Sequence, residues 1–567
     1  MSPDPTKVKQ PIETLFTSRN LVSLLIIASL GAILVLPLFL RGFPDGDDIR
    51  HHYRWAYYFW EELKEGVIYP RWLAGANRGY GSPAMFYYPP FTLYVVAAFN
   101  VVARNLLLSI KLSCALAMIA SGVSMYKFSR PMLSRGACVI AAMLYMTAPY
   151  HIFELWRVNA LSEFWSLVWI PLILDAVRRI AQGQGWRASA YLGLSYGLLL
   201  LTNIPISLIV TLILPIFVLI LTRDKRNLVQ VGVGIALGLG ISAIFLVSVV
   251  FETKYVHIDR ILEDRYYQAF AFEDFSALSW ANLFSPANYR KFGAYRKEAN
   301  LTSIGVTLLF ILASIVLMIE RRVVQQDRAR ATLIRATWIV AFASVLMTTR
   351  ISEPLWRAIR SLQYLQSPFR WLVPATFATT LLTAIALHIG RSASRRIVFG
   401  SLLGTAILIN IGFSAHIATQ RPVPLEKLEA ERLDKDVPEY APLWWDEQFH
   451  EELEQSAAVV DDGDADLQAI DDSGVKQSYE VNARTQLTIR FRSVFFPGWA
   501  ARIDGNRVGV QRSKEGNIQL IVPPGEHIVT LRFEETWRHV KAGIVSAVSV
   551  LVVGVIFWRA RRATSKT

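Results

Sequence analysis

Long apolar runs recur along most of this chain, and they constrain its fold more than any other feature. A run of about 18 or more apolar residues is long enough to cross a lipid bilayer as a helix. We therefore predict an α-helical polytopic membrane protein with about 12 transmembrane helices. The predicted helices span residues 21–40, 106–126, 137–150, 163–179, 188–203, 205–222, 229–250, 301–319, 333–349, 371–390, 396–415 and 541–558.

The placement of Lys and Arg predicts the orientation of these helices. Cytoplasmic loops of membrane proteins retain basic residues. If the short run 91–103 is interfacial or re-entrant rather than spanning, every second loop is basic and both termini lie in the cytoplasm. The net charge of +14 then follows from the cytoplasmic loops and does not indicate a nucleic-acid partner.

The same assignment puts every chemically rich loop on the external face. The cytoplasmic loops carry no nucleotide-binding signature, and the glycines between 232 and 240 favour close helix packing instead. Cys114 and Cys138 both fall in apolar segments, so a disulfide framework is not expected. The external loops are 41–90, 150–162, 203–205, 251–300, 350–370 and 416–540, which suggests one composite site.

The segment 416–540 differs from the rest and divides the chain into three parts. Residues 1–415 form the predicted transmembrane domain, 416–540 an external domain, and 541–567 a last helix with a basic tail. Period-two alternation at about 478–535, broken by turn residues such as Asp504-Gly505, predicts a small sandwich-like β domain. The acidic tract from Asp461 to Asp466 lacks the pattern of a calcium loop, and we interpret it as a solvated loop.

Carboxylates and histidines gather just after the first predicted helix. Asp45, Asp47 and Asp48 are followed directly by His51 and His52. If a helix begins near Asp48, then Asp48 and His52 lie one turn apart on one face. A carboxylate backed by a histidine suits general-base catalysis or metal ligation. Helix capping by Asp47 or Asp48 is the structural alternative, but the density of the cluster favours function.

Other polar side chains of the external loops are candidates for substrate binding. Arg71 lies among aromatic residues, and an arginine can bind phosphate with several donors. Glu163 begins an apolar helix, where an ionisable group either reaches the interface or has a function. Loop architecture and ordinary headgroup contacts are the alternatives. The candidates are Arg71, Asn77, Tyr80, Tyr88, His151, Arg157, Glu163, Gln366 and Arg370, beside the catalytic candidates Asp48, Asp47 and His52.

Several of these motifs resemble a known family. The Asp-His stretch, with GVIYPRW (66–72) and NRGYGSPAMFYYPP (77–90), resembles the first external loop of a large bacterial family of polytopic proteins labelled as related to 6-pyruvoyl-tetrahydropterin synthase. PYHIFELWRVNALSE (149–163) and LTNIP (201–205) are further matches, whereas QSPFRW (366–371) departs at Ser367 and Phe369 from the family's usual Q-F-P-W-R. The C-terminal domain resembles that of membrane proteins that glycosylate cell-envelope polymers. Members of the family look like glycosyltransferases of the GT-C superfamily.

The resemblance implies a mechanism and a location. GT-C enzymes take a sugar from a polyprenyl-phosphate donor on the outer side of the bacterial cytoplasmic membrane and transfer it to a glycan, lipid or protein acceptor. A carboxylate after the first helix, here Asp48 or Asp47, would act as the base. Arg71, Arg370 and Arg157 would bind the leaving phosphate. Some members use a divalent metal such as Mg or Mn, for which the candidate ligands are Asp47, Asp48, His52 and Glu163.

Two other functions compete with this interpretation. A lipid or sugar transporter (a flippase) would show internal repeats and broken helices, and the sequence shows no repeat between its halves. A non-catalytic scaffold of envelope assembly would use the β domain for binding and would not need the carboxylates of Asp45, Asp47 and Asp48.

Overall fold

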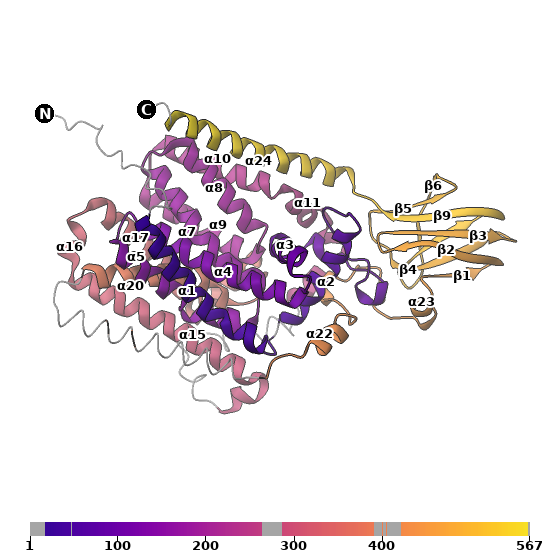
Figure 1. The fold of residues 1–567 in the computed structure, drawn as a ribbon, viewed down its shortest axis with the longest axis horizontal. Helices are drawn as coiled ribbons and strands as arrows, with labels where there is room; N and C mark the ends of the chain where they lie inside the picture. Colours follow the sequence, from indigo (N-terminus) through magenta and orange to yellow (C-terminus); the bar gives the residue numbers. More distant parts are fainter. Residues whose placement is uncertain are drawn as a thin grey trace.

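A helical bundle and a smaller β domain make up the fold, which we describe from a computed structural model. The structure describes residues 18–46, 48–262, 286–389, 400, 404 and 421–564. The β domain lies beyond one end of the bundle, and the last helix, α24 (Trp537–Thr564), runs from it back along the bundle (Figure 1). We call the two ends of the bundle the β-domain end and the far end.

Seven helices in the described part of the chain are long and apolar enough to cross a membrane, or up to nine if each of two bent pairs is one span. The bent pairs are α5 with the segment Pro149–Val158, at 42°, and α10 with the segment Ala243–Tyr255, at 74°. Besides α24, the main helices of the bundle, whether or not they pass this test, are α1 (Ser18–Arg41), α4 (Leu106–Ser129), α5 (Arg135–Met146), α7 (Leu161–Ala181), α8 (Gly185–Leu200), α9 (Ile204–Leu221), α10 (Lys225–Ile241), α11 (Ala243–Glu252), α15 (Pro286–Ile319), α17 (Arg328–Met347) and α20 (Leu372–Ile389).

The polytopic helical fold is confirmed, whereas about 12 spans were expected and the described residues hold fewer. The expected helix at 396–415 lies almost entirely outside the described residues. The expected helix 163–179 corresponds to α7, which carries charged residues at both ends. The expected helix 188–203 corresponds to α8, which has 16 residues. The run 91–103 forms α3 (Phe91–Ala103), whose 13 residues are too few to cross a bilayer.

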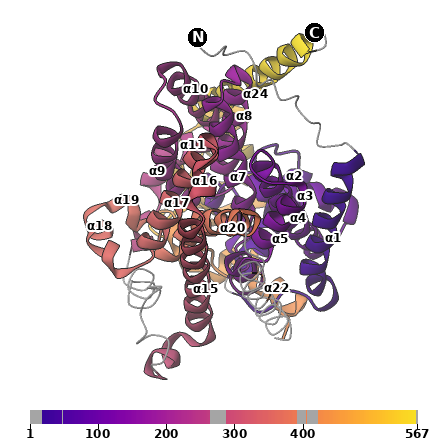
Figure 2. The same cartoon turned by 90° about the vertical axis from the view of Figure 1, so that its left-hand side faces the viewer.

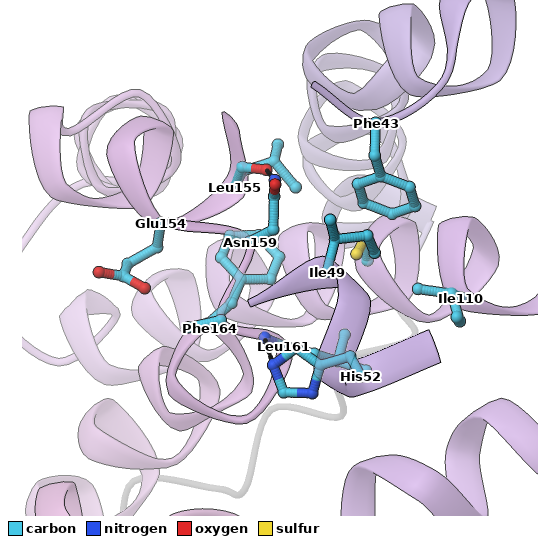
Figure 3. A pocket seen from close by; sticks show the side chains of 11 residues that line it. Phe43, Ile49, His52, Ile110, Glu154, Leu155, Asn159, Leu161 and Phe164 are labelled. Carbon is cyan, nitrogen blue, oxygen red and sulfur yellow. Dashed lines mark hydrogen bonds between the residues drawn. The ribbon is translucent and has the colours of Figure 1, made fainter. Parts of the chain in front are cut away.

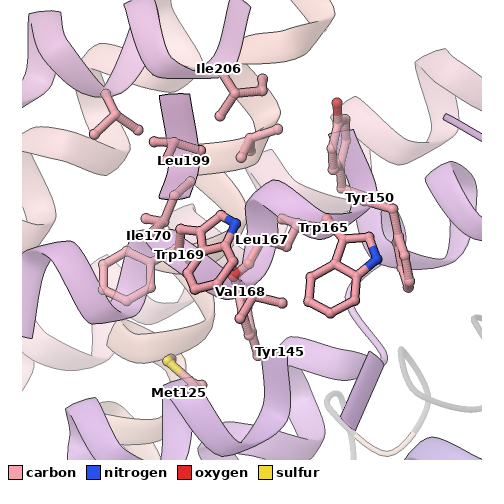
Figure 4. Close-up of a cluster of buried hydrophobic side chains, with 14 of the residues drawn as sticks. Met125, Tyr145, Tyr150, Trp165, Leu167, Val168, Trp169, Ile170, Leu199 and Ile206 are labelled. Carbon is pink, nitrogen blue, oxygen red and sulfur yellow. The ribbon is translucent and has the colours of Figure 1, made fainter. Parts of the chain in front are cut away.

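Helices α7 and α20 form the interior of the bundle. The spanning window of α20 is 89% buried, and α20 packs against α15, α17 and α5 (Figure 2). The tryptophans of α7 lie among other apolar side chains (Figure 4), and their indole nitrogens donate to hydroxyls of neighbouring segments, Trp165 to Ser113 and Trp169 to Thr202, both at 3.0 Å. A helix that is apolar on all sides is a buried one, so α7 is a rigid support for the residues at its first turn.

The β domain consists of two antiparallel sheets, ordered β1-β4-β8-β7 and β2-β3-β9-β5-β6. The Asp504-Gly505 turn is found where predicted, between β5 and β6, with positive φ at both residues. The strands are β1 (Ala458–Asp462), β2 (Ala465–Ser473), β3 (Lys476–Ala483), β4 (Leu487–Val494), β5 (Trp499–Ile503), β6 (Asn506–Val508), β7 (Gln511–Arg512), β8 (Asn517–Val522) and β9 (Gly525–Phe533).

The acidic tract is exposed to solvent, as expected, but it is not all loop. It comprises the end of β1, a short turn and the start of β2, which belong to different sheets, so the domain begins earlier than the alternation indicates. Arginines of β4 and of the turn before it neutralise the tract: Arg490 pairs with Asp461, and Arg484 with Asp464 and Asp466. Charge pairing with these arginines stabilises two strands whose own alternation is weak.

A layer of mixed structure joins the bundle to the β domain. It contains α2 (Ile49–Lys64), the loop to Pro90, α22 (Leu425–Glu431) and the chain to His450, and we call it the cap layer (Figure 1). Asp436 is its centre, since it accepts hydrogen bonds from Trp55 Nε1 at 2.9 Å and Ser82 Oγ at 2.6 Å while its backbone N–H donates to Asn77 at 2.7 Å. The cap layer therefore ties residues far apart in sequence into one body.

Candidate active site

A buried ion pair stands at the β-domain end of the bundle. Glu163, in the first turn of α7, has a side chain that is 5% exposed. Arg370 Nε donates to Glu163 Oε2 at 2.9 Å, and the Tyr150 hydroxyl donates to the other carboxylate oxygen. Two segments that the sequence separates by about two hundred residues thus meet through charge-assisted hydrogen bonds, which are the strong ones.

The turn before Arg370 directs its guanidinium inward. Gln366 adopts a positive φ of 62°, and Ser367 Oγ accepts a hydrogen bond from the backbone of Phe369. Arg370 NH1 donates back to Leu365 O at 2.7 Å and to Gln366 Oε1 at 2.8 Å. The guanidinium is thereby held by its own turn as well as by Glu163.

Asp48 reaches the same place from α2. Its backbone N–H donates to Val158 O at 3.0 Å, at the end of the π-helix Glu154–Val158. Gly46 makes this close approach possible, because a Cβ at Gly46 would lie 1.9 Å from Asn159 Oδ1. Asp48 precedes α2, as expected, but its side chain does not cap the helix. The capping alternative therefore does not account for its carboxylate.

His52 is one turn from Asp48, as predicted, and both of its ring nitrogens are engaged. Nε2 accepts from the backbone N–H of Leu161 at 3.0 Å, so the proton is on Nδ1, 3.3 Å from the Tyr88 hydroxyl. Burial lowers the pKa of His52 to about 3, and the neighbouring His51 lowers it further. A neutral imidazole with both nitrogens bonded positions Tyr88 and the start of α7 and is poorly placed to bind a metal ion.

Carboxylates outnumber cations around this pair. Asp48 and Glu163 both act electrostatically on Arg370 and on the Tyr88 hydroxyl, whose pKa is raised by burial and by these carboxylates. Glu154 joins them: it is 2% exposed, and its Oε2 atom has no hydrogen-bond partner among the described residues. We call Asp48, Glu154, Glu163, Arg370 and Tyr88 the acidic cluster, which can accept a proton or bind a group with positive character.

A small cavity adjoins the acidic cluster. Its volume is about 10 Å³, room for roughly one water molecule. His52, Glu154 and Asn159 line it together with apolar side chains such as Phe43 and Phe164 (Figure 3). In the described part of the chain, no three His, Cys, Asp or Glu side chains are arranged to hold a metal ion.

Four of the candidates lie elsewhere in the structure. Arg71 is 3% exposed and bonds Glu535 and Ile244 O, both at 2.8 Å. Asn77 and Tyr80 belong to the cap layer, where Tyr80 accepts from the backbone of His450 at 2.7 Å. His151 is a core residue that contacts Ser121 Oγ at 3.1 Å.

The last two candidates are Arg157 and Asp47. Arg157 lies half-buried in the π-helix, and its carbonyl faces Gly46. Asp47 lies outside the described residues.

Sequence reasoning missed Tyr150 and gave Glu154 no role. Both belong to the PYHIFELWRVNALSE motif, and an acid nine residues before Glu163 in an apolar context was the available signal. Tyr150 carried no such signal in the sequence, because an aromatic residue before a membrane helix is common at the interface.

Comparison with known proteins adds a family. A model described as 6-pyruvoyl-tetrahydropterin synthase related domain, membrane protein, matches residues 85–427. The match includes Glu154, Glu163 and Arg370 and begins after Asp48 and His52. An uncharacterized protein of Lactococcus lactis subsp. cremoris (strain MG1363) is 22% identical over 258 residues, which cover 42% of this chain and 41% of that protein.

Proposed function

We propose that this chain, which belongs to the family of membrane proteins related to 6-pyruvoyl-tetrahydropterin synthase, is a GT-C-type glycosyltransferase. It would move a sugar from a polyprenyl-phosphate donor to an acceptor of the cell envelope. The reaction would take place at the β-domain end, on the external face of a bacterial cytoplasmic membrane. The single observation that carries the proposal is the convergence of Asp48, Glu154 and Glu163 around Arg370 and Tyr88.

Asp48 is the base in this mechanism. It takes the proton of an acceptor hydroxyl, whose oxygen attacks the anomeric carbon of the donor. The bond from that carbon to the phosphate oxygen breaks, and the polyprenyl phosphate leaves with the electron pair, which inverts the anomeric centre. A positioned general base contributes about 10²–10⁴-fold to the rate. Asp48 is half-buried at the start of α2, and its side chain does not cap that helix.

Arg370 is the cation that faces the leaving phosphate. Its Nε is held by Glu163 while the guanidinium keeps further donors, and its side chain is 21% exposed. A donor to a developing negative charge is worth about 10²–10³-fold. Glu163, Tyr150 and Gln366 are positioning residues that fix the guanidinium plane.

A transfer assay tests the proposal. Purified protein in lipid receives a panel of polyprenyl-phosphate sugars with candidate acceptors, and the release of free polyprenyl phosphate is followed. We expect Asp48→Asn to lose at least about a hundredfold in turnover. Asp45→Asn is the matched control, because Asp45 is exposed and pairs with Arg50 and Lys427 at the surface. Equal rates for the wild type and Asp48→Asn would contradict the role of Asp48.

A specific observation supports a second candidate, a lipid or sugar transporter. Two helix pairs are bent by 42° and 74° at short breaks, and discontinuous helices form binding sites in many transporters. Buried carboxylates also serve as proton relays in such proteins. Movement of a labelled polyprenyl-phosphate sugar across vesicles, without release of the phosphate product by any acceptor tested, would favour the transporter over the enzyme.

A further inference from the structure

A second polar cluster lies in the bundle, toward its far end. Asp175 of α7 is fully buried (0% exposed). Arg178 Nε donates to its Oδ1 at 3.1 Å, and Arg179 Nε to its Oδ2 at 2.7 Å. At about 1.5 Å of rise per residue, Asp175 lies about 18 Å along α7 from Glu163. This cluster is therefore separate from the candidate active site.

Two other helices bring cations to the same place. Lys127, in the last turn of α4, donates to the Tyr191 hydroxyl at 2.9 Å, and its Nζ lies 4.2 Å from the centre of the Tyr191 ring. Asp175, Arg179 and Arg187 all act electrostatically on Lys127. We call Lys127, Asp175, Arg178, Arg179, Arg187 and Tyr191 the basic cluster.

The basic cluster carries more positive than negative charge. Both carboxylate oxygens of Asp175 are taken by Arg178 and Arg179. Across the ranges that the structure describes, neither Lys127 nor Arg187 forms an ion pair with a carboxylate. Like charges that converge in a partly buried site repel one another, and an added anion would remove that cost.

The preference for basic cytoplasmic loops does not explain this arrangement. That preference concerns Lys and Arg in loops, where water screens each charge. Here Arg178 is 4% exposed, Lys127 of α4 and Arg179 of α7 both contact the Tyr191 ring, and Arg187 of α8 acts electrostatically on Lys127. The arrangement has the form of a site for an anion with several oxygens.

We propose that the basic cluster binds the phosphate of an anionic lipid headgroup. Lys127 and Arg187 supply the donors, while Arg178 and Arg179 stay with Asp175 and add positive potential. A lipid is favoured over a soluble anion because Trp186, next to Arg187, is 51% exposed, and an exposed tryptophan at a helix end is typical of the membrane–water interface. Basic pockets between transmembrane helices bind anionic headgroups in this way.

Native mass spectrometry of the purified full chain tests the proposal. Wild type, Arg187→Gln and Lys127→Gln receive increasing phosphatidylglycerol against a phosphatidylcholine background, and the retained lipid is counted. We expect each variant to bind phosphatidylglycerol about fivefold to tenfold more weakly than the wild type. Arg335→Gln, at an exposed arginine of α17, removes one charge outside the cluster and should bind like the wild type.

The same samples distinguish the source of the phosphate. Inorganic phosphate and pyrophosphate are added to one set without anionic lipid, in which thermal unfolding is followed, and to a second set that holds phosphatidylglycerol, in which the retained lipid is counted. If these anions stabilise the wild type as much as phosphatidylglycerol does and also displace that lipid, the lipid proposal is wrong. Equal retention of phosphatidylglycerol by the wild type and Arg187→Gln would also overturn it. Arg187 is half-buried and forms no ion pair in the described ranges, so this variant should fold even if Lys127→Gln does not.

Discussion

The Glu163–Arg370 pair gives the sharpest test of the structure. Each partner is replaced alone, by Glu163→Gln and Arg370→Gln, and then both together. Removing one partner of a buried ion pair costs about 3–5 kcal/mol, because the other charge is left buried and uncompensated. Arg370 retains Leu365 O and Gln366 Oε1 and is 21% exposed, so we expect a loss at or just below the lower end of that range, about 2–3 kcal/mol, for Glu163→Gln.

Loss of Arg370 should be more costly. Glu163 is only 5% exposed and would keep the Tyr150 hydroxyl alone as a donor, so Arg370→Gln should cost about 3–4 kcal/mol. The double variant leaves neither charge, and we expect it to be about 2 kcal/mol more stable than the sum of the single losses predicts.

The free energy of unfolding is measured by denaturant titration in mild detergent for the wild type, the two single variants and the double variant. The cycle Glu353→Gln with Arg357→Gln is the control, because that pair lies on the surface with the arginine 75% exposed, and its coupling should be below about 1 kcal/mol. If the stability loss of the double variant equals the sum of the two single losses to within about 0.5 kcal/mol, the buried Glu163–Arg370 pair is refuted.

Three further predictions follow from single side chains. Burial lowers the pKa of His52 to about 3, below the value of about 6.5 in the unfolded chain, so the wild type should lose stability as pH falls from 6.5. In unfolding titrations, His52→Gln should cost about 1–3 kcal/mol at pH 7 and should lack this pH dependence. Burial raises the pKa of Glu62 to about 8, so the wild type should lose stability as pH rises from about 4.5 toward 8; Glu62→Gln should exceed the wild type in stability at pH 8 and match it near pH 5. Gly46→Ala, which forces a Cβ against Asn159, should cost about 1–3 kcal/mol in thermal unfolding. Gly232→Ala is the control and should be neutral or stabilising, because no atom of the described residues would lie within 4 Å of the added Cβ.

The sequence predicted the parts of the fold that depend on local pattern. Apolar runs located α1, α4, α9 and α20, and the Asp-Gly turn between β5 and β6 followed from backbone preference alone. Strand β1 and the start of β2 were missed because their charges face Arg484 and Arg490, which come later in the chain. No window of sequence contains that pairing, so an acidic strand looks like a solvated loop.

The candidate site shows the same division between local and distant information. The helical spacing of Asp48 and His52 and the position of Glu163 at a helix start could be predicted, since each needs one element only. The sequence could not predict that Arg370 pairs with Glu163 while Arg71 pairs with Glu535. Both arginines lie next to aromatic residues in the sequence, and only tertiary packing distinguishes a cation in the acidic cluster from one that anchors α24.

The loop from Asp45 to Pro90 thus performs two separate tasks. Its first part brings Asp48 and His52 to the acidic cluster, and its later part, with Asn77 and Tyr80, holds the cap layer. Trp55 joins the two, because its ring lies 4.3 Å from that of Tyr88 and its nitrogen donates to Asp436. Since Tyr88 contacts His52, any displacement of the cap layer that breaks the bond to Asp436 also loosens the cluster. The density of polar residues in this loop therefore reflects both the chemistry of the cluster and the contacts that position it.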